Sequence, residues 1–365
     1  MNANTSRQSP AEGEESAKLF ARTARDLPTG RHQFHKERLM AQIHETRQQE
    51  RTAAVAPVKA RRLRLPRPAI MLPALAAALA GVVVATVASS GGGGVRDGGV
   101  ATGPALTTTV GVATTKGVPQ LLDQISLAAA EATHPVVKPG EYIYIESKSA
   151  DTFLRTVDDR TTLASHQLHT RQLWESPDGT KGWLIDPAVN EGPEGETLSL
   201  PDELGNTPKA HLGAPSYEYL AKLTTDPDKL LAKIYKETEG QGNTPDQQAF
   251  ATIGDLLAES YPPAELYSAL FKAAAKIPGV VVVNNAVDAV GRSGVAVARL
   301  DETSGQREEW IFDTKTHVFL GERLVQVNQL SGTDALIKPG TVTYTSAILN
   351  RAIVGGIKQT PSQAG

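Results

Sequence analysis

The sequence predicts an α+β fold in which a curved antiparallel sheet packs against helices, preceded by a single transmembrane helix. Alternating apolar residues, typical of strands, occur on both sides of a block of helical segments between residues 217 and 276. An uncharged run of 21 residues at 69–89 precedes this region. As a helix it would span about 30 Å, which matches the hydrocarbon core of a bilayer.

The composition is that of a chain that folds. Hydrophobic residues make up 40% and charged residues 21% of the 365 residues, which excludes disorder throughout. The absence of Cys excludes disulfide scaffolds, lipoprotein anchors, thiol nucleophiles, iron–sulfur clusters and Cys-based zinc sites. The remaining classes are an ordinary globular domain and a membrane-anchored one.

Charge is distributed unevenly about the uncharged run. Residues 1–68 carry 14 Lys and Arg against 7 Asp and Glu, whereas residues 90–365 carry 23 against 33. Because basic flanks remain on the cytoplasmic side, we expect a single-pass protein of the cell membrane with a cytoplasmic N-terminus and an extracytoplasmic C-terminal domain. A buried soluble helix fits this pattern less well. A cleaved signal peptide would need a charged region 68 residues long.

The basic segment 1–68 is predicted to be partly disordered. Residues 31–52 lack helix breakers but hold few apolar side chains, so a helix there needs a partner. Two interpretations remain open: residues 18–55 bind a cytoplasmic protein, or they form a solvated stem that only sets membrane orientation. Nucleic acid is not an expected partner, because aromatic residues are not interleaved with the basic ones.

Three further regions follow the predicted transmembrane helix. Residues 90–117 are rich in Gly, Thr and Ala without periodicity, which predicts a flexible linker. Residues 118–355 are expected to form one α+β domain, and residues 356–365 a disordered tail. Within the domain, residues 187–215 are rich in Pro, Gly and Glu and predict a long surface loop.

Periodicity places the elements of the domain. Predicted helices cover 118–133, 217–223, 227–238, 246–260 and 264–276. Predicted strands cover 141–147, 172–175, 182–185, 280–283, 295–300, 307–312, 318–327 and 341–350. Pro177, Asp178 and Gly179 predict a tight turn between two strands that carry Trp174 and Trp183.

The sequence contains no complete catalytic or metal-binding motif. The motifs of serine hydrolases, zinc proteases and calcium loops are missing or incomplete. We therefore expect no catalytic, cofactor-binding or metal-ligating residues and no cofactor. An envelope enzyme with an unrecognised site is the least favoured hypothesis.

Individual polar residues are predicted to have structural roles. His166 and His169 are three positions apart on a predicted strand, so they should lie on opposite faces as surface residues. The pairs Asp158–Asp159 and Glu308–Glu309 should diverge and be exposed. The three Trp (Trp174, Trp183 and Trp310) should pack a sheet face against a helix, with a ligand platform as the alternative for one of them.

Several short motifs carry a resemblance. They are Ala24 to Met40, Trp-Glu-Ser-Pro-Asp-Gly from Trp174, Ile-Pro-Gly-Val from Ile277, and Glu308 to Asp313. Together they resemble an uncharacterised family of actinobacterial single-pass membrane proteins, often encoded beside extracytoplasmic-function sigma factors. The resemblance implies an outer domain that senses and a cytoplasmic segment that contacts a sigma factor. The His-x-x-x-Cys-x-x-Cys pattern of zinc-binding anti-sigma factors is absent, so any sigma-binding element would be of another type.

The plan of the outer domain is similar to the half-barrel fold of lipoprotein carriers and periplasmic sensors. The sequence is therefore consistent with two functions. The first is a membrane-anchored regulatory or sensory protein linked to sigma-factor signalling. The alternative is an extracytoplasmic lipid- or lipoprotein-binding module that holds an apolar ligand and has no signalling role.

Overall fold

The computed structural model describes residues 96–97, 100–132, 135–157, 160–190, 192–202 and 205–361. The predicted cytoplasmic segment and the predicted transmembrane helix at 69–89 lie outside the described residues. Within those residues, every helix is too short or too polar to cross a bilayer. Residues Gly92–Gly365 group as one compact unit.

The predicted α+β class with a large antiparallel sheet is confirmed. The described residues form 13 strands in the order β1-β2-β5-β4-β13-β12-β11-β10-β9-β3, with β6, β7 and β8 continuing from β4. The strands are β1 (Arg96–Asp97), β2 (Val100–Gly103), β3 (Ala113–Thr114), β4 (Tyr142–Val157), β5 (Arg160–His166), β6 (His169–Glu175), β7 (Gly182–Ile185), β8 (Glu196–Thr197), β9 (Val280–Val287), β10 (Ser293–Asp301), β11 (Gln306–Phe312), β12 (Phe319–Gln326) and β13 (Val342–Val354).

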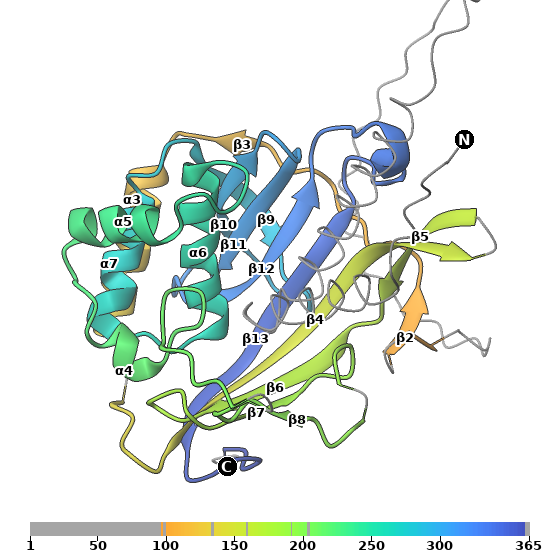
Figure 1. Ribbon diagram of the computed structural model, residues 1–365. Coiled ribbons are helices and arrows are strands. Elements are labelled where there is room, and N and C mark those ends of the chain that lie inside the picture. Colours follow the sequence, from red (N-terminus) through yellow and green to blue (C-terminus); the bar gives the residue numbers. More distant parts are fainter. Residues whose placement is uncertain are drawn as a thin grey trace, which may run out of the picture. The chain divides into compact units, whose positions relative to one another are not determined.

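Helices cover one face of the strands β9 to β12 (Figure 1). The helices are α3 (Val118–Glu131), α4 (Tyr217–Leu220), α5 (Pro227–Glu237), α6 (Pro245–Glu259), α7 (Ala264–Ala274) and the short 3₁₀ helix η2 (Gly332–Leu336). We call this side of the sheet the helix face and the opposite side the outer face. The alternation of strand residues separates the two. Trp310 and Phe312 pack against the helices, whereas Ile311 between them belongs to an outer-face cluster.

Helix α6 packs against β11 through an aromatic pair. The ring of Phe250 stacks on that of Trp310, with 3.8 Å between centroids and 7° between planes. Gly254 lies on the same side of α6, where a Cβ atom would be 2.5 Å from Nε1 of Trp310. A glycine is therefore required there for the helix to reach the sheet.

Local sequence signals place two elements as predicted. Asp226 caps α5 by accepting hydrogen bonds from the backbone N–H groups of Asp228 and Lys229. The predicted hairpin is formed by β6 and β7, with Trp174 directly opposite Trp183. Gly179 in its turn has φ +73°, which a glycine adopts without strain.

The region predicted as a flexible linker, 90–117, differs from that expectation in its described part. Residues 100–103 form β2, residues 113–114 form β3, and Thr107 pairs with Thr341. The physical reason lies on the outer face, where buried charges face this segment. Arg307 donates to the carbonyl of Gly111, and Arg323 donates to the hydroxyl of Thr108.

The tail predicted as disordered, 356–365, also differs over its described residues. After β13 the chain folds back, and the indole N–H of Trp174 donates to the carbonyl of Gln359 at 2.6 Å. Ile357 packs against a cluster that contains Tyr144 and Trp174. This contact joins two segments 185 residues apart, which no local pattern could indicate.

Candidate functional site

Five ionisable residues gather where β4, β5, β6 and the end of β7 meet. We call Asp151, His166, His169, Arg171 and Asp186 the histidine cluster. His166 Nδ1 lies 2.7 Å from Asp151 Oδ1, and His169 Nε2 lies 3.1 Å from Asp186 Oδ1. The second oxygen of Asp186 is 3.6 Å from Nε of Arg171. The side chains of His166, His169, Arg171 and Asp186 are at most 9% exposed, so these charges interact at short range and with little water between them.

The prediction that His166 and His169 lie on opposite faces as surface residues is wrong. Ser149 pairs with His169 in β6, and Thr152 pairs with Ser165 in β5. Two residues of β4 therefore face three residues of the neighbouring segment. The extra residue reverses the alternation of the strand, as a bulge does, and the two imidazole rings come within 6.3 Å of each other.

Both ring nitrogens of His169 face hydrogen-bond acceptors. Nδ1 faces the carbonyl oxygen of Gln167 at 3.0 Å, and Nε2 faces the carboxylate of Asp186. Both partners are acceptors, so an imidazolium with two N–H groups satisfies both. Ser149 Oγ is 3.4 Å from the same Nε2 that faces Asp186, so this serine, histidine and aspartate do not form a nucleophilic triad.

Asp186 is held rigidly at the end of β7. Its carboxylate accepts a hydrogen bond from the backbone N–H of Ala188, and its own N–H donates to Asn190. Burial opposes ionisation of Asp186. The hydrogen bond from His169 and the positive charges of Arg171 and His169 outweigh burial and lower the pKa of this carboxyl below its usual value.

The cluster thus combines two imidazoles, two carboxylates and one guanidinium within hydrogen-bond or ion-pair distance. With both histidines neutral, the two carboxylates exceed the single charge of Arg171, whereas two protonated histidines make the cluster net positive. Among the described residues, no three His, Cys, Asp or Glu side chains are arranged to hold a metal ion. Imidazole side chains beside carboxylates are groups that pH-dependent switches use.

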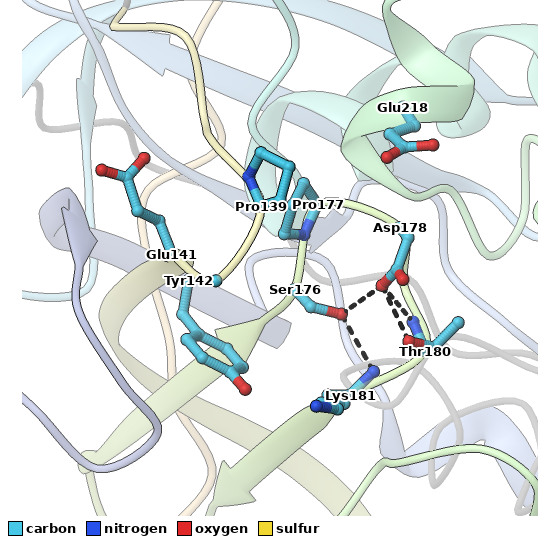
Figure 2. Close-up of a pocket in the computed structure, with 10 residues that line it drawn as sticks. Pro139, Glu141, Tyr142, Ser176, Pro177, Asp178, Thr180, Lys181 and Glu218 are labelled. Atoms are coloured by element: carbon cyan, nitrogen blue, oxygen red, sulfur yellow. Dashed lines mark hydrogen bonds between the residues drawn. The ribbon is translucent and has the colours of Figure 1, made fainter.

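A second polar site lies at the β6–β7 turn (Figure 2). Asp178 accepts hydrogen bonds from the hydroxyl of Ser176 and from the N–H and hydroxyl of Thr180. These bonds lower its pKa, with the Ser176 hydroxyl as the largest cause. The pocket beside this turn has a volume of about 130 Å³. This is well below the roughly 300–1,000 Å³ of typical ligand sites, so the pocket does not supply the predicted apolar cavity.

Beneath the same turn, Glu175 titrates in an unusual range. It is the last residue of β6 and is partly buried on the side of Leu173. Burial, helped by the negative charge of Asp178, raises the pKa of Glu175 to about 8. Glu175 is therefore largely protonated at neutral pH, unlike an ordinary surface carboxyl.

Of the two acidic pairs, the structure describes only Glu308 and Glu309. Asp158 and Asp159 lie outside the described residues. Glu308 and Glu309 diverge as predicted, because Glu308 accepts from Trp310 on the helix face and Glu309 binds two arginines on the outer face. The expectation that they are exposed is wrong, since their relative exposures are 2% and 0%.

The tryptophans divide between the two faces. Trp310 packs against a helix, as predicted. Trp174 and Trp183 lie on the outer face, in contact with the C-terminal segment, and the expected helix packing is wrong for both.

Comparison with known proteins adds no assignment. No protein-family model matches the chain, and a search of curated proteins finds no match.

Proposed function

We propose that the protein is a membrane-anchored sensory or regulatory protein whose extracytoplasmic domain responds to protons. The observation that carries the sensory part is the histidine cluster. Its two imidazoles face the half-buried carboxylate of Asp151 and the buried carboxylate of Asp186, and a proton bound there would change the charge at the junction of four strands. A change in proton concentration outside the membrane would thereby alter the outer domain.

Chain organisation supports the anchored arrangement. The compact unit begins at Gly92, directly after the uncharged run that ends at Ser89. Residues 1–68 are basic and the compact unit is acidic, as expected for a cytoplasmic segment and an outer domain. The cytoplasmic residues 18–55 are the segment that we propose contacts a sigma factor or another regulator.

The absence of Cys allows a direct test of topology. Single substitutions Ser9→Cys and Lys315→Cys place one thiol on each side of the uncharged run. In intact cells, a membrane-impermeant maleimide should label only Lys315→Cys, and lysis should make Ser9→Cys reactive. Labelling of both variants in intact cells, or of neither until lysis, would contradict the anchored arrangement.

Partner capture tests the regulatory part. Tagged full-length protein is isolated from native membranes and compared with protein that lacks residues 18–55. A cytoplasmic regulator that is lost with the deletion supports the proposal. Partners that all survive the deletion contradict it and place the function outside the membrane, in the capture of a lipid or lipoprotein.

The proton response is tested on the same complexes. Cells are exposed to external pH 7.5 or 5.5 before cross-linking, and the captured regulator is quantified. We expect the amount to differ between the two pH values in the wild type and to become pH-independent in His169→Gln. The matched control is His211→Gln, because His211 is exposed and lies outside the histidine cluster. Equal pH dependence in both variants would exclude a role for the cluster.

A further inference from the structure

Three aromatic side chains form one row across the outer face. Tyr144 in β4 is directly opposite Trp174 in β6, which is directly opposite Trp183 in β7. The centroids of Tyr144 and Trp174 are 5.1 Å apart. We call these three residues the aromatic row. It lies on the face opposite Ile143 and Ile145, which pack toward the helices.

Two members of the aromatic row, Tyr144 and Trp183, also make hydrogen bonds that do not involve the C-terminal segment. The hydroxyl of Tyr144 donates to Glu146 at 2.9 Å and accepts from the amide of Gln172 at 2.8 Å. Burial raises the pKa of Tyr144 to about 12, opposed by the hydrogen bond from Gln172 and assisted by the Glu146 carboxylate, so this hydroxyl remains a donor. Trp183 Nε1 donates to the carbonyl of Glu194.

Residues 355–361, which we call the tail segment, cover this row. Contacts of three residues, Ile357, Lys358 and Gln359, hold this segment. Ile357 packs beside Trp174 and Ile185. Trp174 Nε1 donates to the carbonyl of Gln359 at 2.6 Å. Lys358 Nζ lies 4.1 Å from the centroid of the Trp183 ring and 3.9 Å from the carboxylate of Glu194.

The tail segment is attached more loosely than a strand. It is a local turn, in which the N–H of Gln359 donates to the carbonyl of Gly356. Lys358 has φ +64°, a left-handed conformation that costs energy for any residue with a Cβ atom. Gly355 and Gly356 precede it and let the chain turn away from β13. The strain therefore lies in the tail segment, whereas Tyr144 and Trp183 beneath it keep hydrogen bonds to other parts of the chain.

We propose that the aromatic row is a binding site for a peptide segment of a partner protein, and that the tail segment occupies this site in cis. The chemistry of the resident segment defines the partner. The partner's peptide segment supplies an apolar side chain followed by Lys or Arg. It also supplies a backbone carbonyl that accepts from the indole of Trp174. An arginine suits the second position well, because a guanidinium stacks on an indole and pairs with a carboxylate such as Glu194.

This proposal is independent of the membrane anchor and of the proton response. The partner would displace residues 355–361, which would then be free and open to proteolysis. Because the tail segment is tethered, it competes at an effective concentration in the millimolar range. A partner must therefore bind the bare site more tightly than the resident segment does, which restricts the site to specific partners.

The test uses the octapeptide Val-Gly-Gly-Ile-Lys-Gln-Thr-Pro, which has the sequence of residues 354–361. Its labelled form is titrated by fluorescence anisotropy against the full chain and against a chain that ends at Val354. We expect binding to the shortened chain, and binding at least tenfold weaker to the full chain. A peptide with Asp in place of Ile and Glu in place of Lys should fail to bind either protein.

A second variant covers the case in which the shortened chain is unstable. The full-length chain with Ile357→Asp and Lys358→Glu keeps its length but loses the contacts of the tail segment. It should bind the octapeptide like the shortened chain, and adding Trp183→Ala should abolish that binding. Near-ultraviolet circular dichroism verifies that each protein remains folded.

Three results would overturn the proposal. The first is the absence of octapeptide binding, at millimolar peptide, to the folded chain that ends at Val354 or to the folded Ile357→Asp, Lys358→Glu chain. We call these two proteins the tail-released chains. The second is equal affinity for the full chain and both tail-released chains. The third is a full-length protein that forms dimers by exchanging tail segments, shown by a dimer in size-exclusion chromatography that the Ile357→Asp, Lys358→Glu variant lacks. The row would then be an interface between copies of this chain.

Discussion

Glu309 and Arg323 form a buried ion pair across β11 and β12, with 2.7 Å between Oε2 and Nε. Arg307 completes the group, with its Nε 2.8 Å from Oε1 of the same carboxylate. The two guanidinium groups also reach Gly111 and Thr108. One buried carboxylate on the outer face thus positions both arginines that hold residues 108–111 against the sheet.

Removing this carboxylate should destabilise the domain strongly. In Glu309→Ala, Arg307 and Arg323 become buried charges without a counter-ion, and such losses cost about 3–5 kcal/mol. Urea unfolding followed by circular dichroism measures the free energy of unfolding. The control Glu302→Ala removes a carboxylate whose side chain is 66% exposed, and it should cost less than about 0.5 kcal/mol. Similar losses of unfolding free energy in both variants would show that the ion pairs of Glu309 do not stabilise the domain specifically.

Glu175→Gln should stabilise the protein in mildly alkaline solution. The pKa of Glu175 lies near 8 in the folded protein against an ordinary value of 4.5. The unfolded chain therefore ionises first, so the wild type loses stability as the pH rises from 4.5 to 8. Since Glu175 is partly exposed, we expect the variant to be more stable by about 1–3 kcal/mol at pH 8 and unchanged at pH 4.

Unfolding at several pH values checks this expectation. The matched control is Glu218→Gln, because Glu218 lies beside the same turn with a side chain that is 52% exposed. Its unfolding free energy should follow the wild type at every pH. A Glu175→Gln profile parallel to the wild type would mean that Glu175 titrates normally.

Gly254→Ala should destabilise the chain although alanine favours helices. A Cβ atom there would lie 2.5 Å from Trp310 Nε1 and 2.6 Å from Glu308 Oε1. The gain in helix propensity is about 1 kcal/mol, and the clash should exceed it, for a net loss of about 1–3 kcal/mol. Thermal unfolding measures the effect. Gly192→Ala is the control, because a Cβ atom there meets nothing within 4 Å. A stabilised Gly254→Ala would show that α6 can move away from the sheet.

Asp186→Asn should remove a pH-dependent contribution to stability. A carboxyl with a lowered folded pKa stabilises the protein above its unfolded pKa, and this contribution is lost as the pH falls through the folded value. At pH 7 we expect a loss of about 2–4 kcal/mol, because the buried charge of Arg171 loses its carboxylate partner. Below pH 4 the difference from the wild type should shrink. The exposed Asp123→Asn serves as control, and a constant difference at all pH values would contradict the assignment.

The elements that sequence reasoning placed correctly are those whose determinants are local. The β6–β7 hairpin depends on Pro177, Asp178 and Gly179, and the start of α5 depends on Asp226 and Pro227. Each signal lies within a few residues of the feature it defines. The periodic strands β9 to β13 were also predictable, because alternation is a local property of the chain.

The features that were missed depend on distant partners. Residues 100–117 contain no pattern of their own, and their partners Arg307, Arg323 and Thr341 lie about 200 residues away. The histidine cluster depends on one extra residue between β5 and β6, which only the pairing with β4 reveals. Strand alternation without that bulge places His166 and His169 apart, so the sequence alone could not bring them together.

Strand β4 pairs with β13, which leaves the ribosome much later than β4 does. Tyr142 in β4 pairs with Val354 in β13, so one edge of β4 meets its neighbour only after residues 342–354 have been synthesised. Until then β4 presents an open edge of backbone N–H and C=O groups to other nascent chains. Ribosomes that stop before residue 342 would release chains with this edge exposed. Such products should aggregate, whereas chains completed through β13 bury the edge themselves.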